Sequence, residues 1–365
     1  MTGAPGPGPT ADGHRPADGA RRRKGGGKGG RGGGERKMVP DATFTSYYGR
    51  PVVKASPWAA DIPAYLFLGG LAGASSLLGA GADCTDRPAL RRTGRIGALV
   101  GITGSLAALV HDLGRPERFL NMLRVAKPTS PMSMGTWLLT AYGPAAGLAG
   151  VGELAGLLPT RWSDALLGRS VQALARPAGL VAALVGPAVA SYTAVLLSDT
   201  ATPAWHGGRT EMPFVFVGSA AAAAGGLGML GAPLSQAGPA RRMAVAGALA
   251  DLGAARRMEA SMGLAAETLH RGGAGRLLRA SKALTAFGAA ITVMVGGRSR
   301  AASAVAGAAL LVGSACTRFG IFEAGQASAR DPKYTVVPQR QRLEAAGRLV
   351  ADGSPGPNPG REVRL

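Results

Sequence analysis

Residues that exchange protons or donate hydrogen bonds lie at the borders of several apolar segments. Asp61 and Tyr65 open one segment, His111 and Asp112 close the next, and Tyr192 lies near the end of a later one. Histidine changes charge near neutral pH, and ionisable residues beside apolar segments are candidate functional groups. His111 and Asp112 are therefore candidate proton-handling residues.

The composition predicts an integral membrane protein. Apolar residue types make up 46% of the 365 residues and charged types only 17%, so a soluble fold would lack polar surface. The net charge of +20 lies in the two tails and in short intervals between apolar stretches. This distribution fits lipid headgroups or an acidic partner better than a nucleic-acid surface, and we expect no nucleic-acid partner.

Apolar stretches long enough to cross a bilayer recur along the chain, since a span needs about 20 residues. The sixth of these is the weakest, because it contains Asp251 and is closed by Arg256 and Arg257. We therefore expect an all-α, polytopic transmembrane bundle of about eight spans. The eight predicted spans are 59–82, 93–111, 132–158, 177–198, 212–232, 243–260, 280–297 and 301–322.

The ends of the chain have a different composition from its middle. Residues 1–43 form a basic tail rich in Gly and Pro, which cannot bury enough surface to fold. We expect a disordered tail over 1–43, a membrane domain over 44–340 and a flexible tail over 341–365. Eight spans place both termini on one side of the membrane, which we name side A. Lys and Arg are slightly more numerous there, but an acidic partner would produce the same bias, so its compartment stays open.

Aromatic residues also gather on side A. Trp58, Trp137 and Trp205 belong there, and only Trp162 lies on the opposite side. An interfacial aromatic belt would occupy both faces about equally. The asymmetry favours a functional cluster, although helix capping combined with a belt remains an alternative.

Two further acids lie within apolar segments. Asp251 and Glu153 are each candidates for a proton path across the membrane. Each is alternatively a paired residue, and Arg256 is the nearest sequence partner for Asp251. The sequence leaves both interpretations open.

Cysteine and histidine are too scarce for a metal centre. Cys84 and Cys316 are the only cysteines, which excludes an iron–sulfur cluster or a Cys-rich zinc site within this chain. Of the four histidines only His111 borders an apolar run, which argues against a bis-histidine haem. We expect no haem, iron–sulfur cluster or metal in this chain.

Several short motifs resemble the NrfD / polysulfide reductase membrane-subunit family over residues 44–340. They are Tyr-Gly-Arg-Pro at 48–51, the glycine run at 69–73, Lys-Pro-Thr-Ser-Pro-Met-Ser-Met-Gly-Thr-Trp at 127–137, Ser-Tyr-Thr-Ala-Val-Leu-Leu at 191–197 and Asp-Pro-Lys-Tyr-Thr-Val-Val-Pro at 331–338. The string at 127–137 is the most specific of these.

The resemblance implies two four-helix bundles in a prokaryotic plasma membrane. It also implies a quinone, menaquinone above all, bound in the first bundle. Partners would be a ferredoxin-like iron–sulfur electron-transfer subunit and a molybdopterin-type catalytic subunit, which this subunit would anchor to membrane lipid. Electrons would pass between the quinone and that partner.

The resemblance also implies which residues hold the quinone. The family's tyrosine in the fourth segment corresponds to Tyr192, while its Asn and His in the first segment are replaced by Asp61 or Ile62 and by Tyr65. Tyr65, Tyr192, Asp61 and Trp137 are the candidate quinone-binding residues.

Two other functions remain possible from the sequence. A small-solute or ion transporter would often show internal repeats, and no clear repeat is visible here. A structural membrane anchor without quinone chemistry is the third hypothesis. The substrate of a catalytic partner, the direction of electron flow and proton pumping stay open.

Overall fold

The computed structural model describes residues 51–113, 117, 121, 123–157 and 166–351. The predicted tail 1–43 lies outside the described residues. Of the predicted flexible tail 341–365, residues 341–351 are helical and the rest lies outside the described residues. Within the described part, all regular secondary structure is helical, which confirms the all-α prediction.

Eight long helices and four shorter elements make up the described chain. The long helices are α1 (Asp61–Asp83), α2 (Pro88–Asp112), α4 (Pro131–Ala155), α6 (Leu166–Ser198), α8 (Met212–Gly231), α9 (Gly238–Ser261), α11 (Gly272–Met294) and α12 (Arg300–Arg330). The others are α7 (Pro203–Gly207), the 3-10 helix η1 (Gly263–Ala266), α10 (Glu267–His270) and α13 (Lys333–Ala351).

The long helices match the eight predicted segments in order, but several are longer. A proline stands in the first turn of α2, α4, α8 and α9, where its missing N–H costs nothing. Helix α6 starts at Leu166, before the predicted 177, and continues through Pro177 and Pro187. Helix α12 continues to Arg330, past the predicted end at 322. Apolar runs thus located the helices but not their polar extensions.

Six of the eight long helices are apolar enough to count as membrane spans by length and composition, namely α1, α2, α6, α8, α11 and α12. Helices α4 and α9 are long enough, with 25 and 24 residues, but are not among the six. The prediction of about eight spans is therefore not confirmed by hydropathy. Both helices nevertheless pack between helices that meet the criterion.

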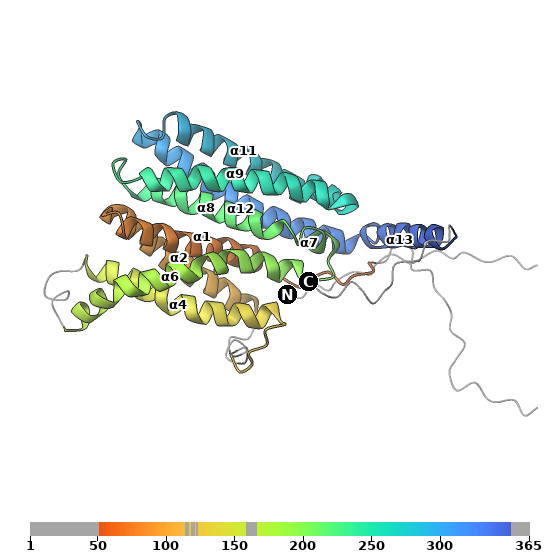
Figure 1. Cartoon of the computed structure of the whole chain (residues 1–365), viewed down its shortest axis with the longest axis horizontal. Coiled ribbons are helices and arrows are strands. Elements are labelled where there is room, and N and C mark those ends of the chain that lie inside the picture. The colour runs from red at the N-terminus through yellow and green to blue at the C-terminus, as the bar shows by residue number, and fades with distance from the viewer. Residues whose placement is uncertain (1–50, 114–116, 118–120, 122, 158–165, 352–365) are drawn as a thin grey trace, which may run out of the picture. The chain divides into compact units, whose positions relative to one another are not determined.

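Successive long helices run in opposite directions (Figure 1). We name the end at which α1, α4, α8 and α11 begin the A end, and the opposite end the B end. The A end lies on the right of Figure 1, together with α7 and α13. It corresponds to side A of the sequence prediction.

The long helices form two bundles with the same packing order. In the first bundle α1 packs on α2, α4 on α6, and α1 on α6. In the second, α8 packs on α9, α11 on α12, and α8 on α12. Helices α1 and α8 pack on each other where the bundles meet. The fold thus repeats an arrangement that the sequence does not reveal as a repeat.

Glycines allow the first and fourth helices of each bundle to touch through their backbones. A Cβ on Gly73 would lie 2.3 Å from the carbonyl oxygen of Gly186, and one on Gly226 would lie 2.6 Å from that of Gly307. Such close approach is a general packing device for helices in lipid, where apolar burial gives little attraction. The two contacts occupy equivalent places in the two bundles.

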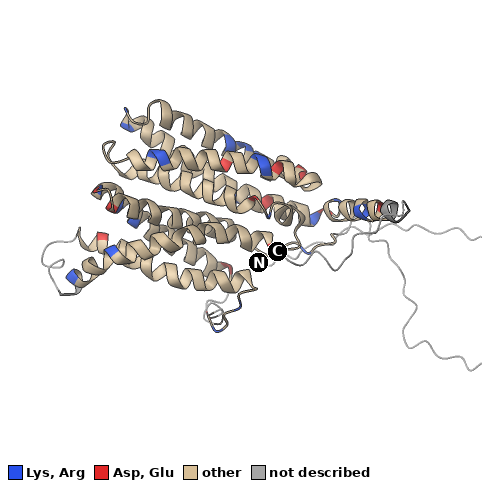
Figure 2. Cartoon of the chain, viewed as in Figure 1, with Lys and Arg blue, Asp and Glu red and all other residues tan. Residues whose placement is uncertain are grey.

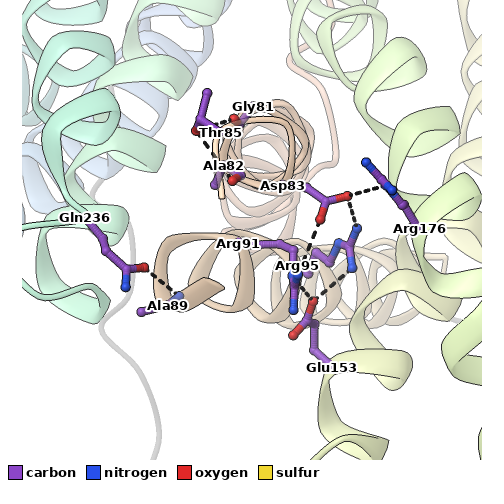
Figure 3. Close-up of polar contacts among 10 residues, drawn as sticks. All are labelled: Gly81, Ala82, Asp83, Thr85, Ala89, Arg91, Arg95, Glu153, Arg176 and Gln236. Atoms are coloured by element: carbon purple, nitrogen blue, oxygen red, sulfur yellow. Dashed lines mark hydrogen bonds and ion pairs between the residues drawn. The ribbon is translucent and has the colours of Figure 1, made fainter. Parts of the chain in front are cut away.

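Charged residues are sparse along the helices of the first bundle and gather toward its ends (Figure 2). At the B end an ion-pair network joins all four helices (Figure 3). Arg95 of α2 contacts Glu153 of α4 at 2.9 Å and Asp83 of α1 at 3.2 Å. Arg91 contacts the same two acids at 2.7 and 3.3 Å, and Arg176 of α6 reaches Asp83 at 3.3 Å.

This network answers the question that the sequence left open for Glu153. The Glu153 and Arg95 side chains are only 6% and 8% exposed, so each needs its partner, because an unpaired buried charge is costly. Glu153 is thus a paired residue of the B end.

At the A end aromatic residues join the two bundles. Trp205 of α7 stacks on Trp58 with ring centroids 6.0 Å apart and contacts Phe322 of α12 at 5.5 Å. The Trp205 indole is fully buried and donates a hydrogen bond to the Ile321 carbonyl at 2.9 Å. Two of the three side-A tryptophans therefore serve packing.

Candidate functional site

A cavity of about 560 Å³ opens at the A end between α4 and α6. Its lining extends to Leu138, seven residues into α4, and to Ala188, ten residues before the end of α6. At 1.5 Å per residue, this corresponds to a depth of about 10–15 Å. The volume is within the range of small-molecule sites, about 300–1,000 Å³.

The deeper wall of the cavity is mainly apolar, whereas its mouth is polar. The wall contains Pro131, Met134, Leu138, Ala188 and Val195, and the mouth contains Thr129, Ser198, Asp199, His206 and Arg209. An apolar slot with few polar groups is the usual form of a site for a lipid-soluble molecule.

Tyr192 contributes a hydroxyl to the cavity wall. Its ring lies over Gly135 of α4, where an added Cβ would be only 1.8 Å from a ring carbon. The missing side chain at 135 is therefore what lets the tyrosine lie between α4 and α6. The tyrosine is buried, at 9% exposure.

Behind Tyr192 lies Tyr65 of α1, which is 2% exposed. The two tyrosine side chains are close enough to interact with each other. The structure therefore brings together two residues that are far apart in the sequence and that the sequence nominated separately. Tyr192 lines the cavity, whereas Tyr65 supports it from within the bundle.

His206 places an ionisable group at the cavity mouth. Its Nδ1 lies 3.3 Å from the Ser198 carbonyl oxygen, which can only accept, so Nδ1 carries the proton in this contact. In the neutral ring Nε2 is then the acceptor. Asp199 lines the same mouth, so a carboxylate and an imidazole both border the space beside Tyr192.

His111 and Asp112 lie elsewhere at the A end. His111 Nδ1 contacts Asp61 Oδ2 at 3.0 Å, with side chains 79% and 33% exposed. Asp112 Oδ1 accepts a hydrogen bond from the Ala59 N–H at 3.5 Å. Asp61, His111 and Asp112 thus connect the end of α2 to the start of α1. None of the three lines the cavity.

Trp137 also lies outside the cavity lining. Its side chain is exposed, and its indole N–H donates to the Val125 carbonyl at 3.4 Å. Ser133, one turn earlier on α4, accepts a hydrogen bond from the Lys127 N–H and donates one to the same carbonyl. These contacts hold the loop before α4, whose Pro128 and Thr129 line the cavity.

The sequence did not nominate four residues that matter to this site. The predicted topology placed Asp199 and His206 on side A with Tyr192, but neither was nominated as a site residue. Gly135 stands within the motif at 127–137, yet its role depends on the ring that faces it. No sequence signal marked Arg209.

The arrangement provides three elements that a hydrogen-bonding, lipid-soluble redox molecule requires. The apolar walls of α4 and α6 accommodate a hydrocarbon chain, and the Tyr192 hydroxyl can donate to a carbonyl oxygen. His206 and Asp199 can receive protons near water. The described residues contain no group of three or more His, Cys, Asp or Glu placed to hold a metal ion.

Comparison with known proteins supports this interpretation of the fold. The family model described as polysulphide reductase, NrfD matches residues 52–266, which include the whole first bundle and the first two helices of the second. A search among curated proteins found no matching relative. With more than half of its length matched, the chain is a multi-pass membrane protein of the NrfD family.

Proposed function

We propose that this protein is the quinone-reactive membrane subunit of a multi-subunit oxidoreductase in a prokaryotic plasma membrane. Members of its family are membrane subunits of such complexes. The observation that carries the quinone assignment is the cavity between α4 and α6, which has Tyr192 in its wall and Asp199 and His206 at its mouth.

The chemistry is the exchange of quinol and quinone. Oxidation of a quinol breaks two O–H bonds and releases two protons and two electrons. The Tyr192 hydroxyl would donate a hydrogen bond to one headgroup oxygen, and its interaction with Tyr65 would orient it. The imidazole of His206 and the carboxylate of Asp199 would receive the protons beside the aqueous phase.

The electrons must leave the chain through a partner. We assign that role to a ferredoxin-like iron–sulfur subunit docked at the A end, followed by a catalytic subunit of the molybdopterin type. The A end is favoured because the cavity opens there. Menaquinone is the quinone that the family resemblance favours.

The substitution Tyr192→Phe tests this proposal. It removes the hydroxyl and keeps the ring on Gly135, so we expect an intact complex whose quinol-linked turnover is about tenfold lower, the effect of one hydrogen bond to the reacting group. The measurement is quinol oxidation by the whole complex purified from native membranes, with subunit composition determined in parallel.

Tyr142→Phe is the matched control. Tyr142 is also buried in the first bundle, where its hydroxyl bonds Ser76 Oγ at 2.8 Å, but it does not line the cavity. Its loss should leave turnover unchanged. Equal turnover in wild type and Tyr192→Phe would contradict the assignment. Absence of bound quinone in the native complex would favour the structural-anchor hypothesis, and solute uptake by the chain alone would favour a transporter.

A further inference from the structure

The second bundle contains a separate group of buried ionisable side chains. Asp251 of α9 is 4% exposed and Arg318 of α12 is fully buried. Asp251 is ten residues before the end of α9, which places it about 15 Å from the A end of that helix. An acid at this depth in an apolar helix bundle requires a physical explanation.

Asp251 lines a small cavity. The cavity has a volume of about 20 Å³, enough for about one water molecule. Ser281 and Thr317 also line it, with their hydroxyl oxygens 2.6 Å apart. A carboxylate and two hydroxyls around a space of this size can hydrogen-bond a water molecule or pass a proton through one.

Arg318 stabilises negative charge at Asp251 without enclosing it. One of its nitrogens, Nη2, donates to the Phe216 carbonyl at 2.7 Å, and its guanidinium lies 3.8 Å from the centre of the Phe216 ring. Nε and Nη1 have no hydrogen-bond partner in the described part of the chain. The two residues interact through their charges, not through a direct hydrogen bond, unlike the directly bonded ion pairs of the B end.

A charged pair connects the cavity with the surface at the A end. Glu259 of α9 and Lys282 of α11 line the cavity and form an ion pair with each other. Glu259 also lies 3.7 Å from His270 Nε2, whose side chain is 56% exposed. Ionisable groups therefore follow one another from the exposed histidine to the buried aspartate.

The groups that face Asp251 come from every helix packed around it. Arg318 belongs to α12 and Lys282 to α11, while Glu259 lies two turns along α9 itself. Helix α8 contributes Val215, an apolar side chain, to the cavity. On the side of Arg318 away from Glu259, a Ser219–Ser314 hydrogen bond of 2.7 Å joins α8 to α12.

We infer that Asp251 is a proton-binding site loaded from the A end through Glu259 and Lys282. A hydrated proton enters at His270 and is passed through the small cavity, and an O–H bond forms on the Asp251 carboxylate while water is released at the surface. Unloading is the reverse transfer. The positive charge of Arg318 stabilises the ionised carboxylate, which can then accept the proton. No oxidant or reductant takes part.

This site is independent of the proposed quinone cavity. It lies in the other bundle, shares no lining residue with that cavity, and needs no quinone for its test. Failure of one proposal therefore leaves the other intact.

The test uses the full-length protein in phosphatidylcholine nanodiscs without quinone. Infrared difference spectra recorded during a pH titration in H₂O and D₂O should show, apart from the bands of the carboxyls that face water, a higher-frequency carbonyl stretch of a protonated carboxyl in an apolar environment that shifts on deuteration. Asp251→Asn should remove this band. Asp331→Asn, the same change at an exposed acid after α12, should leave it intact. Glu259→Gln should keep the band but slow its H/D exchange.

The outcomes separate a proton site from a structural charge. A band that persists in Asp251→Asn, or no titrating carboxyl band in the wild type, would overturn the inference. If Asp251→Asn fails to fold, Thr317→Val serves instead. It removes a hydroxyl beside the cavity and should shift the frequency of the band, and an unshifted band in folded Thr317→Val would equally refute the proposal.

Discussion

At the scale of single residues, the orientation of Tyr192 depends on a side chain that is missing. Gly135 leaves the space that the tyrosine ring occupies, and Tyr65 lies behind the ring and interacts with its side chain. The site therefore combines three helices, α1, α4 and α6. A larger residue at 135 would act on the cavity without touching a bound molecule.

Gly135→Ala should displace the Tyr192 ring. The added methyl would lie 1.8 Å from a ring carbon, so we expect a loss of about 1–3 kcal/mol in the free energy of unfolding, together with weaker quinone binding. Thermal unfolding in detergent and quinone titration measure the two effects.

Gly143→Ala on the same helix is the control for that change. Nothing lies within 4 Å of the added carbon, so helix propensity alone should stabilise this variant by about 0.5–1 kcal/mol. If the two variants unfolded at the same temperature and bound quinone equally, the ring at 192 would not be held by the glycine.

At the scale of helices, the first bundle is fastened differently at its two ends. At the B end the Asp83–Arg91–Arg95–Glu153–Arg176 network joins α1, α2, α4 and α6, as Figure 3 shows. At the A end α4 and α6 separate around the cavity. The ion pairs therefore hold the four helices together at the B end, whereas the proposed ligand would enter at the A end.

Breaking this network should loosen the whole first bundle. Arg95→Gln would leave Glu153 and Asp83 with one partner fewer, and we expect a loss of about 3–5 kcal/mol, because buried charges would remain uncompensated. Arg92→Gln is the neighbouring control, since Arg92 is exposed and should change stability by no more than about 0.5 kcal/mol. Chemical denaturation in detergent compares them, and equal midpoints would show that the network adds no stability.

At the scale of the whole molecule, both bundles share one packing order but contain different polar groups. The first has paired tyrosines between its first and fourth helices, and the second has the Ser219–Ser314 pair between helices at the same positions in its own order. The second bundle also contains the buried pair of Asp251 and Arg318. The repeat thus concerns backbone packing, while side chains give the bundles separate chemistry.

The same repeat predicts eight membrane crossings, including the less apolar α4 and α9. Single cysteines at exposed positions of the B end, namely native Cys84, Ser235→Cys and Arg298→Cys, should then react with a membrane-impermeant maleimide from one face. Ala201→Cys at the A end should react from the other face.

Both native cysteines are replaced by serine in the background for the introduced sites. If α9 did not cross, Ser235→Cys and Arg298→Cys would be labelled from opposite faces. If α4 did not cross, Cys84 and Ser235→Cys would be labelled from opposite faces. Either pattern would contradict the eight-crossing topology.

The sequence by itself determined the all-helical membrane fold, the order of the eight long helices and the family. The physical reason is that bilayer thickness sets the length of apolar runs, so such runs can be recognised locally. It also singled out Tyr192, which corresponds to a tyrosine of the family, and Tyr65, which stands where the family has a different residue. The apolar runs did not predict the helix ends that extend beyond them, as in α6 and α12.

Only the tertiary structure decided which ionisable side chains meet. Sequence neighbours suggested the pairs His111 with Asp112 and Asp251 with Arg256, whereas the fold places Asp61 against His111 and Arg318 near Asp251. Charged partners in a helix bundle are chosen by the faces of helices that pack together, and those helices can be separated by any length of chain. For the same reason the sequence placed Asp199 and His206 on the same side as Tyr192, but only the fold shows that all three line one cavity.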